Sequence, residues 1–187
     1  MTAKSSEKKG SFSEGGATLE NRKIKRLTVL SLLVSLAMIL SYVESLIPPL
    51  IAVPGVKLGL SNAVTLFALY IFGWREAAVI SFVRICLSAL LFGNPLSLVY
   101  SLSGGALSLL GASLLRRLGA FSPIGVSTAS GVLHNVGQMI AVVLTLENSG
   151  LWSYLPVLLI SGTLAGAIVG IIAGIIINRL RNLASRL

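Results

Sequence analysis

Six apolar segments, separated by short breaks, constrain the fold of this chain more than any other feature. A helix needs about 20 apolar residues, with a range of about 17 to 25, to cross the hydrocarbon core of a bilayer. The segments run over residues 27–47, 58–72, 77–92, 96–115, 124–146 and 155–177. The second and third are short, so we expect them to be tilted or to form a less regular unit. The pattern predicts an all-α membrane protein with about six transmembrane helices.

Composition supports the same class. Hydrophobic residues make up 55% of the chain and charged residues 11%, which would leave a soluble fold with too little polar surface. The net charge of +9 could indicate nucleic acid, but the basic residues flank apolar segments, and no soluble domain remains to present them. Anionic lipid headgroups of the bilayer are the expected counter-charge, and no nucleic-acid partner is expected.

The distribution of basic residues predicts the orientation. With six spans, 13 of the 15 Lys and Arg residues fall on one side, Lys57 falls on the other and Arg84 lies within a span. Because basic residues are retained in the cytoplasm, we expect a multi-pass protein of the cell (inner) membrane with both termini cytoplasmic. We therefore expect a disordered basic cytoplasmic tail at 1–26, a transmembrane domain at 27–178 and a basic cytoplasmic tail at 179–187.

Two ionisable residues at depth stand out. Glu44 lies in the last turns of the first span, and Arg84 lies near the middle of the third. An ionisable group in hydrocarbon costs about 2.5–3.5 kcal/mol on insertion scales, so it normally faces the protein interior with a partner. Glu44 could pair with Arg84 or with Lys57. Such a pair either locks two helices together or contacts a polar or anionic solute.

A second polar group lies along the fifth span. His134 and Gln138 are four residues apart and hence on one helical face, and Asn135 adjoins them. Hydrogen bonding between helices and the lining of a solute site both explain such a stripe. A metal site is not expected, because His134 is the chain's one histidine and no second strong ligand is spaced with it.

Small residues repeat every four positions in two spans. Such a stripe allows another helix to approach closely, whether from the same chain or from another subunit. A second possible docking ridge lies in the first span. The residues concerned are Gly162, Gly166, Gly170 and Gly174 in the sixth span, and Ser31 and Ser35 in the first.

The chain lacks the residues that several common catalytic mechanisms require. The chain has no aspartate, so it cannot carry the aspartate-rich motifs that hold magnesium and diphosphate in polyprenyl synthases. No phosphate-binding loop of the Walker type is present. One cysteine, Cys86, and one histidine cannot build a nucleophilic triad without aspartate. We expect no catalysis by this chain alone and no cofactor.

A set of motifs resembles a known family. They are YVESLIPP at 42–49, PGVKLGLSN at 54–62, Arg84, LFGNP at 91–95, YSLSGG at 100–105 and HNVGQ at 134–138. Together they are similar, over residues 27–178, to the Gx transporter family, often labelled heptaprenyl diphosphate synthase component I. The resemblance implies a six-helix bundle like the S components of energy-coupling-factor transporters, which bind small solutes and dock on a coupling subunit with two ATPases.

Two functional hypotheses follow. In the first, the chain is a solute-binding transport subunit for a small polar or anionic metabolite or cofactor precursor. Its substrate-binding residues, beneath the proline-rich loop before the second span, would be Glu44, Lys57, Asn62, Arg84, His134, Asn135 and Gln138. In the second, it is a non-catalytic accessory subunit of a prenyl synthase in isoprenoid and menaquinone biosynthesis. Arg116, Arg117 and the basic tail would then contact the synthase or its diphosphate.

Overall fold

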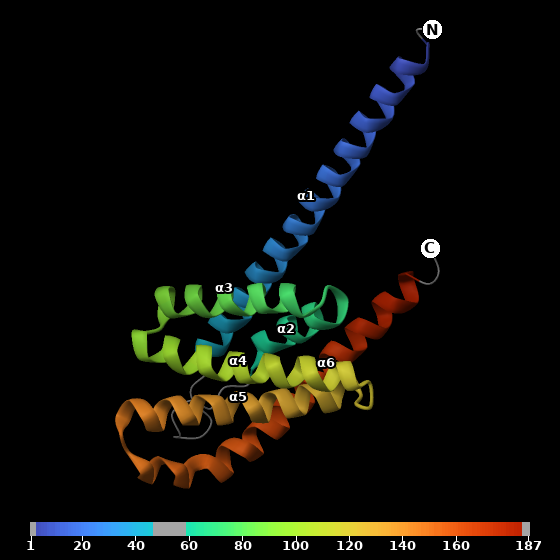
Figure 1. Cartoon of the computed structure of the whole chain (residues 1–187). Helices are drawn as coiled ribbons and strands as arrows, with labels where there is room; N and C mark the ends of the chain where they lie inside the picture. Colours follow the sequence, from blue (N-terminus) through green and yellow to red (C-terminus); the bar gives the residue numbers. More distant parts are fainter. Residues whose placement is uncertain (1–2, 47–58, 185–187) are drawn as a thin grey trace.

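The computed structural model describes residues 3–46 and 59–184, and within these ranges every regular element is a helix (Figure 1). Lys57 and the proline-rich loop lie outside the described residues. The elements are α1 (Ala3–Leu46), α2 (Leu60–Ile71), α3 (Trp74–Phe92), α4 (Pro95–Leu118), α5 (Pro123–Leu146), the 3₁₀ helix η1 (Ser149–Tyr154) and α6 (Leu155–Ala184). The six α-helices correspond in order to the six apolar segments.

Four stretches are long and apolar enough to cross a membrane. They are Lys23–Leu46, Pro95–Leu118, Pro123–Leu146 and Ser149–Arg179. Helix α2 is apolar but only 12 residues long, as the short second segment predicts. The prediction of an all-α membrane bundle is therefore confirmed.

Local chemistry sets the helix boundaries. Asn94 caps α4, because its side chain accepts a hydrogen bond from the Ser97 amide at 2.7 Å while the Ser97 hydroxyl bonds back to Asn94. Gly119 ends α4 with φ 69°, a left-handed conformation that glycine adopts without strain. Pro95 follows its cap at a position where a missing N–H costs nothing.

Helix α1 extends further than the sequence predicts. It begins at Ala3 and passes through the basic stretch for which we expected disorder. Figure 1 shows α1 projecting beyond the bundle and leaving it at the same end as α6, as an even number of spans requires. The boundaries of the transmembrane domain at 27 and 178 stay a prediction.

Helices α4, α5 and α6 pack with their backbones in contact. A Cβ atom added at Gly166 would lie 2.7 Å from the Ser127 carbonyl oxygen, and one at Gly162 would lie 2.9 Å from that of Gly131. The predicted glycine ridge of α6 thus faces α5 of the same chain. Gly170 shares this close packing, with Ile124, whereas a Cβ at Gly174 would meet Pro123 only at 4.0 Å.

Helices α1, α2 and α3 pack more openly, around small and aliphatic residues such as Ala37, Leu69 and Ile80, which are fully buried. Ser31 and Ser35 lie on the opposite, exposed face of α1, where the Ser35 hydroxyl donates to the Ser31 carbonyl at 3.0 Å. Among the described residues, no other helix covers this face.

Polar side chains tie these helices together at one end of the bundle. Arg116 of α4 donates to the carbonyl oxygens of Leu69 and Tyr70 at the end of α2, and its guanidinium lies 5.2 Å from the centre of the Tyr70 ring. Arg26 of α1 forms an ion pair with Glu76 of α3. These contacts come from side chains, in contrast to the backbone contacts of α4–α6.

Candidate functional site

A polar cavity lies in the interior of the bundle, between all six α-helices. Its volume is about 70 Å³, enough for a few water molecules. Six of the seven predicted binding residues line it, and the seventh, Lys57, lies outside the described residues. The six are Glu44, Asn62, Arg84, His134, Asn135 and Gln138. The structure thus brings together residues from α1, α2, α3 and α5.

Arg84 is the buried cation of the cavity, with 8% of its surface exposed. One terminal nitrogen donates to the Ser61 hydroxyl, and the other donates to Asn62 Oδ1 at 3.3 Å. Both partners lie in the first turn of α2. The third nitrogen, Nε, is buried and has no hydrogen-bond partner among the described residues. The guanidinium is therefore held in place by α2, and its Nε–H is available for a further hydrogen bond.

Glu44 is buried at the end of α1, where its Oε1 accepts a hydrogen bond from the Gly59 amide. Gly59 has φ 70° and directly precedes α2. Glu44 therefore fixes the entry to α2, while its carboxylate and the Arg84 guanidinium line the same cavity. Glu44 interacts electrostatically with the Arg84 guanidinium, as the sequence predicts, while the hydrogen bonds of Arg84 go to the first turn of α2. The alternative pair with Lys57 falls outside the described residues.

The polar stripe of α5 divides into two roles. Asn135 Nδ2 donates to the Leu158 carbonyl oxygen at 2.7 Å and lies 3.4 Å from the Ser161 hydroxyl, so it joins α5 to α6. Gln138 is 8% exposed, and its Oε1 has no hydrogen-bond partner among the described residues. Asn135 is thus an interhelical contact that also lines the cavity, whereas Gln138 leaves an acceptor available there.

His134 lines the cavity beside these two residues and is half-buried. A search of the described residues finds no cluster of three His, Cys, Asp or Glu side chains that could hold a metal ion. The arrangement supplies hydrogen-bond donors, acceptors and one positive and one negative charge.

Several hydroxyl groups were not predicted as part of the site. Ser61 and Thr65 lie four residues apart on α2, and Ser81 precedes Arg84 by three residues on α3, so each pair shares a helical face. Thr65 Oγ1 is buried without a partner among the described residues. This spacing is visible in the sequence and could have located the lining of α2 and α3. Ser101 and Ser108 of α4 also line the cavity, and so do Ser127 and Ser130, which belong to the predicted polar stripe of α5.

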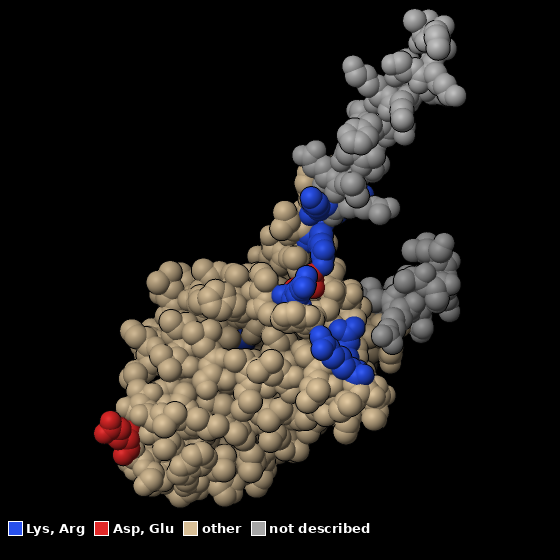
Figure 2. Space-filling model, viewed as in Figure 1, with Lys and Arg blue, Asp and Glu red and all other residues tan. Residues whose placement is uncertain are grey.

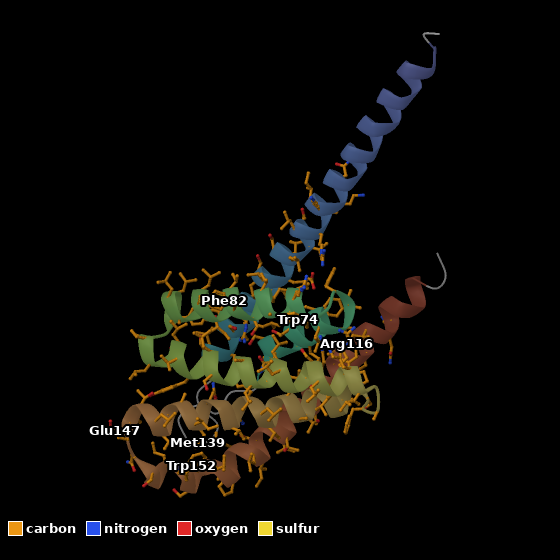
Figure 3. The ribbon with its side chains drawn as sticks, viewed as in Figure 1. Trp74, Phe82, Arg116, Met139, Glu147 and Trp152 are labelled. Atoms are coloured by element: carbon orange, nitrogen blue, oxygen red, sulfur yellow. The ribbon has the colours of Figure 1, made fainter. Side chains whose placement is uncertain are left out.

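Charge is distributed unevenly between the two ends of the bundle. Figure 2 shows the described Lys and Arg side chains gathered at the end from which α1 and α6 leave. Glu147 lies at the opposite end, as its label in Figure 3 shows. Basic residues are enriched at the cytoplasmic ends of membrane proteins, so this distribution agrees with the predicted orientation, which stays a prediction.

A family model described as heptaprenyl diphosphate synthase component I matches residues 33–176. A solved structure of the S component of a bacterial ECF transporter is similar, with 21% sequence identity and a TM-score of 0.65, and the match covers 87% of this chain and 98% of that one. At that identity the likeness shows the fold. The comparison with curated proteins found no match.

Proposed function

The chain belongs to the heptaprenyl diphosphate synthase component I family, also known as the Gx transporter family, and we propose that it is a solute-binding subunit of a membrane transporter. The observation that carries the proposal is the buried polar cavity, in which Arg84 Nε and Gln138 Oε1 remain without protein partners among the described residues. The S-component fold supports it, because the similar structure is itself part of a transporter.

Helix packing alone does not require these groups. A buried polar group without a hydrogen bond loses several kcal/mol relative to water, and an ionised group in a membrane loses more. Asn135 and Ser108 meet this requirement through contacts with neighbouring helices, to Leu158 and Ser130 respectively. Arg84 and Gln138 retain capacity that a bound molecule can use.

The unused groups indicate a class of solute. Arg84 Nε offers a charged donor, so it suits an acceptor such as a carboxylate or phosphate oxygen. Gln138 Oε1 offers an acceptor, so it suits a hydroxyl or N–H group. A small polar or anionic metabolite or cofactor precursor that carries both groups would pair with them, and the cavity of about 70 Å³ would have to widen to admit it.

The proposed partners follow from the fold. An S component works with a coupling subunit and two ATPases, and this chain has no phosphate-binding loop of its own. We assign the docking role to the exposed face of α1 around Ser31 and Ser35, because no other described helix covers it. In this arrangement both termini are cytoplasmic, and the chain performs no catalysis itself.

The accessory-subunit hypothesis takes second place, although the description of the family names a synthase component. It assigns synthase contact to Arg116 and Arg117. Arg116, however, is engaged by the carbonyls of Leu69 and Tyr70, so helix packing accounts for it. The polar cavity has no role in that hypothesis.

Native mass spectrometry of the protein extracted gently from its own membrane tests the proposal. We expect a small polar or anionic molecule to accompany the wild-type protein. Loss of a charged hydrogen bond costs about 1.5–3 kcal/mol, so Arg84→Ala should lower its retention about tenfold or more. Gln138→Leu should lower it less, because its hydrogen bond is uncharged.

Arg75→Ala is the matched control, because Arg75 lies on the same helix as Arg84 but is exposed and outside the cavity. It should retain the molecule. Each variant must elute as a single species, so that loss of ligand is separated from loss of fold. Equal retention by wild type and Arg84→Ala would remove Arg84 from the site, and an empty wild-type protein carrying a synthase subunit would favour the second hypothesis.

A further inference from the structure

An apolar groove runs along the outside of the bundle between α3 and α4, and its volume is about 700 Å³. Its large side chains include Phe82 and Leu110, which are 58% and 68% exposed. Ala78, Gly105 and Ala106 also line it, and these small residues leave the space open. In a bilayer, such a groove faces lipid.

One end of the groove differs from the rest. Trp74, the first residue of α3, and Arg117, the penultimate residue of α4, both line it. Because the two helices are consecutive and antiparallel, these residues lie at the same level, and Figure 3 places Trp74 and Arg116 toward the same end of the bundle. Arg75 does not line the groove, and its guanidinium lies 5.8 Å from the Trp74 ring centre. Tryptophan and arginine at the end of an apolar groove are typical of the headgroup level.

Arg117 can form an ion pair with a ligand, because no described side chain neutralises its charge. Arg116 is held by the end of α2, and Arg26 is paired with Glu76. Arg117, in contrast, is exposed and forms no hydrogen bond or ion pair with any described residue. The groove is therefore apolar along its length and ends at the Arg117 guanidinium, whose charge no described residue neutralises.

We propose that this groove binds an anionic phospholipid, with an acyl chain between α3 and α4 and the phosphate group against Arg117. An acyl chain fits the apolar lining, and the phosphate complements the guanidinium. Basic pockets between transmembrane helices on the cytoplasmic side bind anionic headgroups for this reason. The site is separate from the polar cavity, so the proposal does not depend on the solute.

The two tryptophans of the chain provide the test. Trp152→Phe leaves Trp74, in the groove, as the reporter. The protein is reconstituted in phosphatidylcholine vesicles that contain the same minor fraction of either brominated phosphatidylglycerol or brominated phosphatidylcholine, and tryptophan quenching is measured. One arginine at a membrane surface implies a preference of about fivefold for the anionic lipid. Trp74→Phe leaves Trp152, near the opposite end of the bundle, and should show no preference.

Arg117→Gln in the Trp152→Phe protein should abolish the preference at Trp74. Lys23→Gln is the matched control, because it removes one exposed charge from α1 outside the groove, and it should retain the preference. Ala106→Phe, which fills the groove, should reduce quenching by both brominated lipids. Equal quenching of Trp74 by the two lipids would overturn the proposal, as would an equal loss of preference in Arg117→Gln and Lys23→Gln.

Discussion

The two halves of the bundle are held together by different means. In α4–α6, glycines bring backbones into contact, as at Gly131 and Gly162, where an added Cβ would lie within 3 Å of the facing carbonyl oxygen. In α1–α3, side chains make the connections between helices, through Arg84 and the Arg26–Glu76 pair, and Arg116 of α4 joins the two halves. The polar cavity lies where the two halves meet.

The two halves illustrate two ways in which helices associate in a membrane: close backbone packing and contacts between side chains. Lipid tails are as apolar as leucine side chains, so helices in a bilayer associate through close packing and hydrogen bonds. In the glycine half, the helix backbones pack so closely that an added side-chain atom would clash. In the other half, long side chains make the contacts, so a single substitution removes one contact and leaves the others. We expect substitutions in the two halves to differ in size of effect.

The largest effect should come from Gly166→Ala. The new Cβ would lie 2.7 Å from the Ser127 carbonyl oxygen and 2.8 Å from the Thr128 Cα, and neither backbone atom can move without shifting α5. We expect a loss of about 2–3 kcal/mol in unfolding free energy, the upper part of the range for overpacking. Thermal unfolding in detergent measures it.

Gly174→Ala is its control on the same helix, because the nearest atom to the new Cβ is 4.0 Å away. Alanine favours a helix over glycine, so stability should stay equal or rise. If the two variants behaved alike, close packing would not distinguish the glycine half.

An intermediate effect is expected for Arg116→Leu, because Arg116 of α4 joins the glycine half to α2 of the other half through its side chain. The change removes the hydrogen bonds to Leu69 and Tyr70 and the contact with the Tyr70 ring. Because Arg116 is only half-buried, we expect a loss of about 1.5 kcal/mol, the low end for hydrogen bonds to a charged group. Arg117→Leu, in lipid-free detergent, is the neighbouring control and should change the melting temperature little. An effect larger than that of Gly166→Ala would reverse the proposed difference between the halves.

The smallest effect should come from Glu76→Gln, which breaks the ion pair with Arg26. The Arg26 side chain is 56% exposed, so the pair contributes less than about 1 kcal/mol and is screened by salt. Melting temperatures of the wild type and the variant should differ slightly at low salt and converge at high salt. A difference that persists at high salt would show that the pair is shielded from solvent.

The sequence predicted the helices well because span length and helix breaks are local properties. The fourth predicted segment, 96–115, corresponds to α4, which begins at Pro95 and continues three residues further, to Leu118. The predicted start of the third span at Ala77 was three residues late, since α3 begins at Trp74. The length of an apolar segment indicates only the part of a helix that lies in the hydrocarbon core. The helix itself can continue through polar residues at the level of the lipid headgroups.

Contacts between helices were harder to predict. A glycine repeat indicates that the backbone of another helix approaches closely. The repeat would be the same whether that helix were α5 or belonged to a second subunit. The partners of Arg84 depended on the position of α2, whose first turn supplies Ser61 and Asn62. Six predicted residues nevertheless line one cavity, because polar side chains at depth must face the interior.

The backbone contacts of α5 and α6 have a consequence for how such proteins diversify. Where glycines set the distance between two helices, assembly does not depend on most of the side chains that face the cavity. A lineage can then change its cavity side chains while the packing of the helices persists. A shared fold at 21% identity is the outcome expected of that freedom.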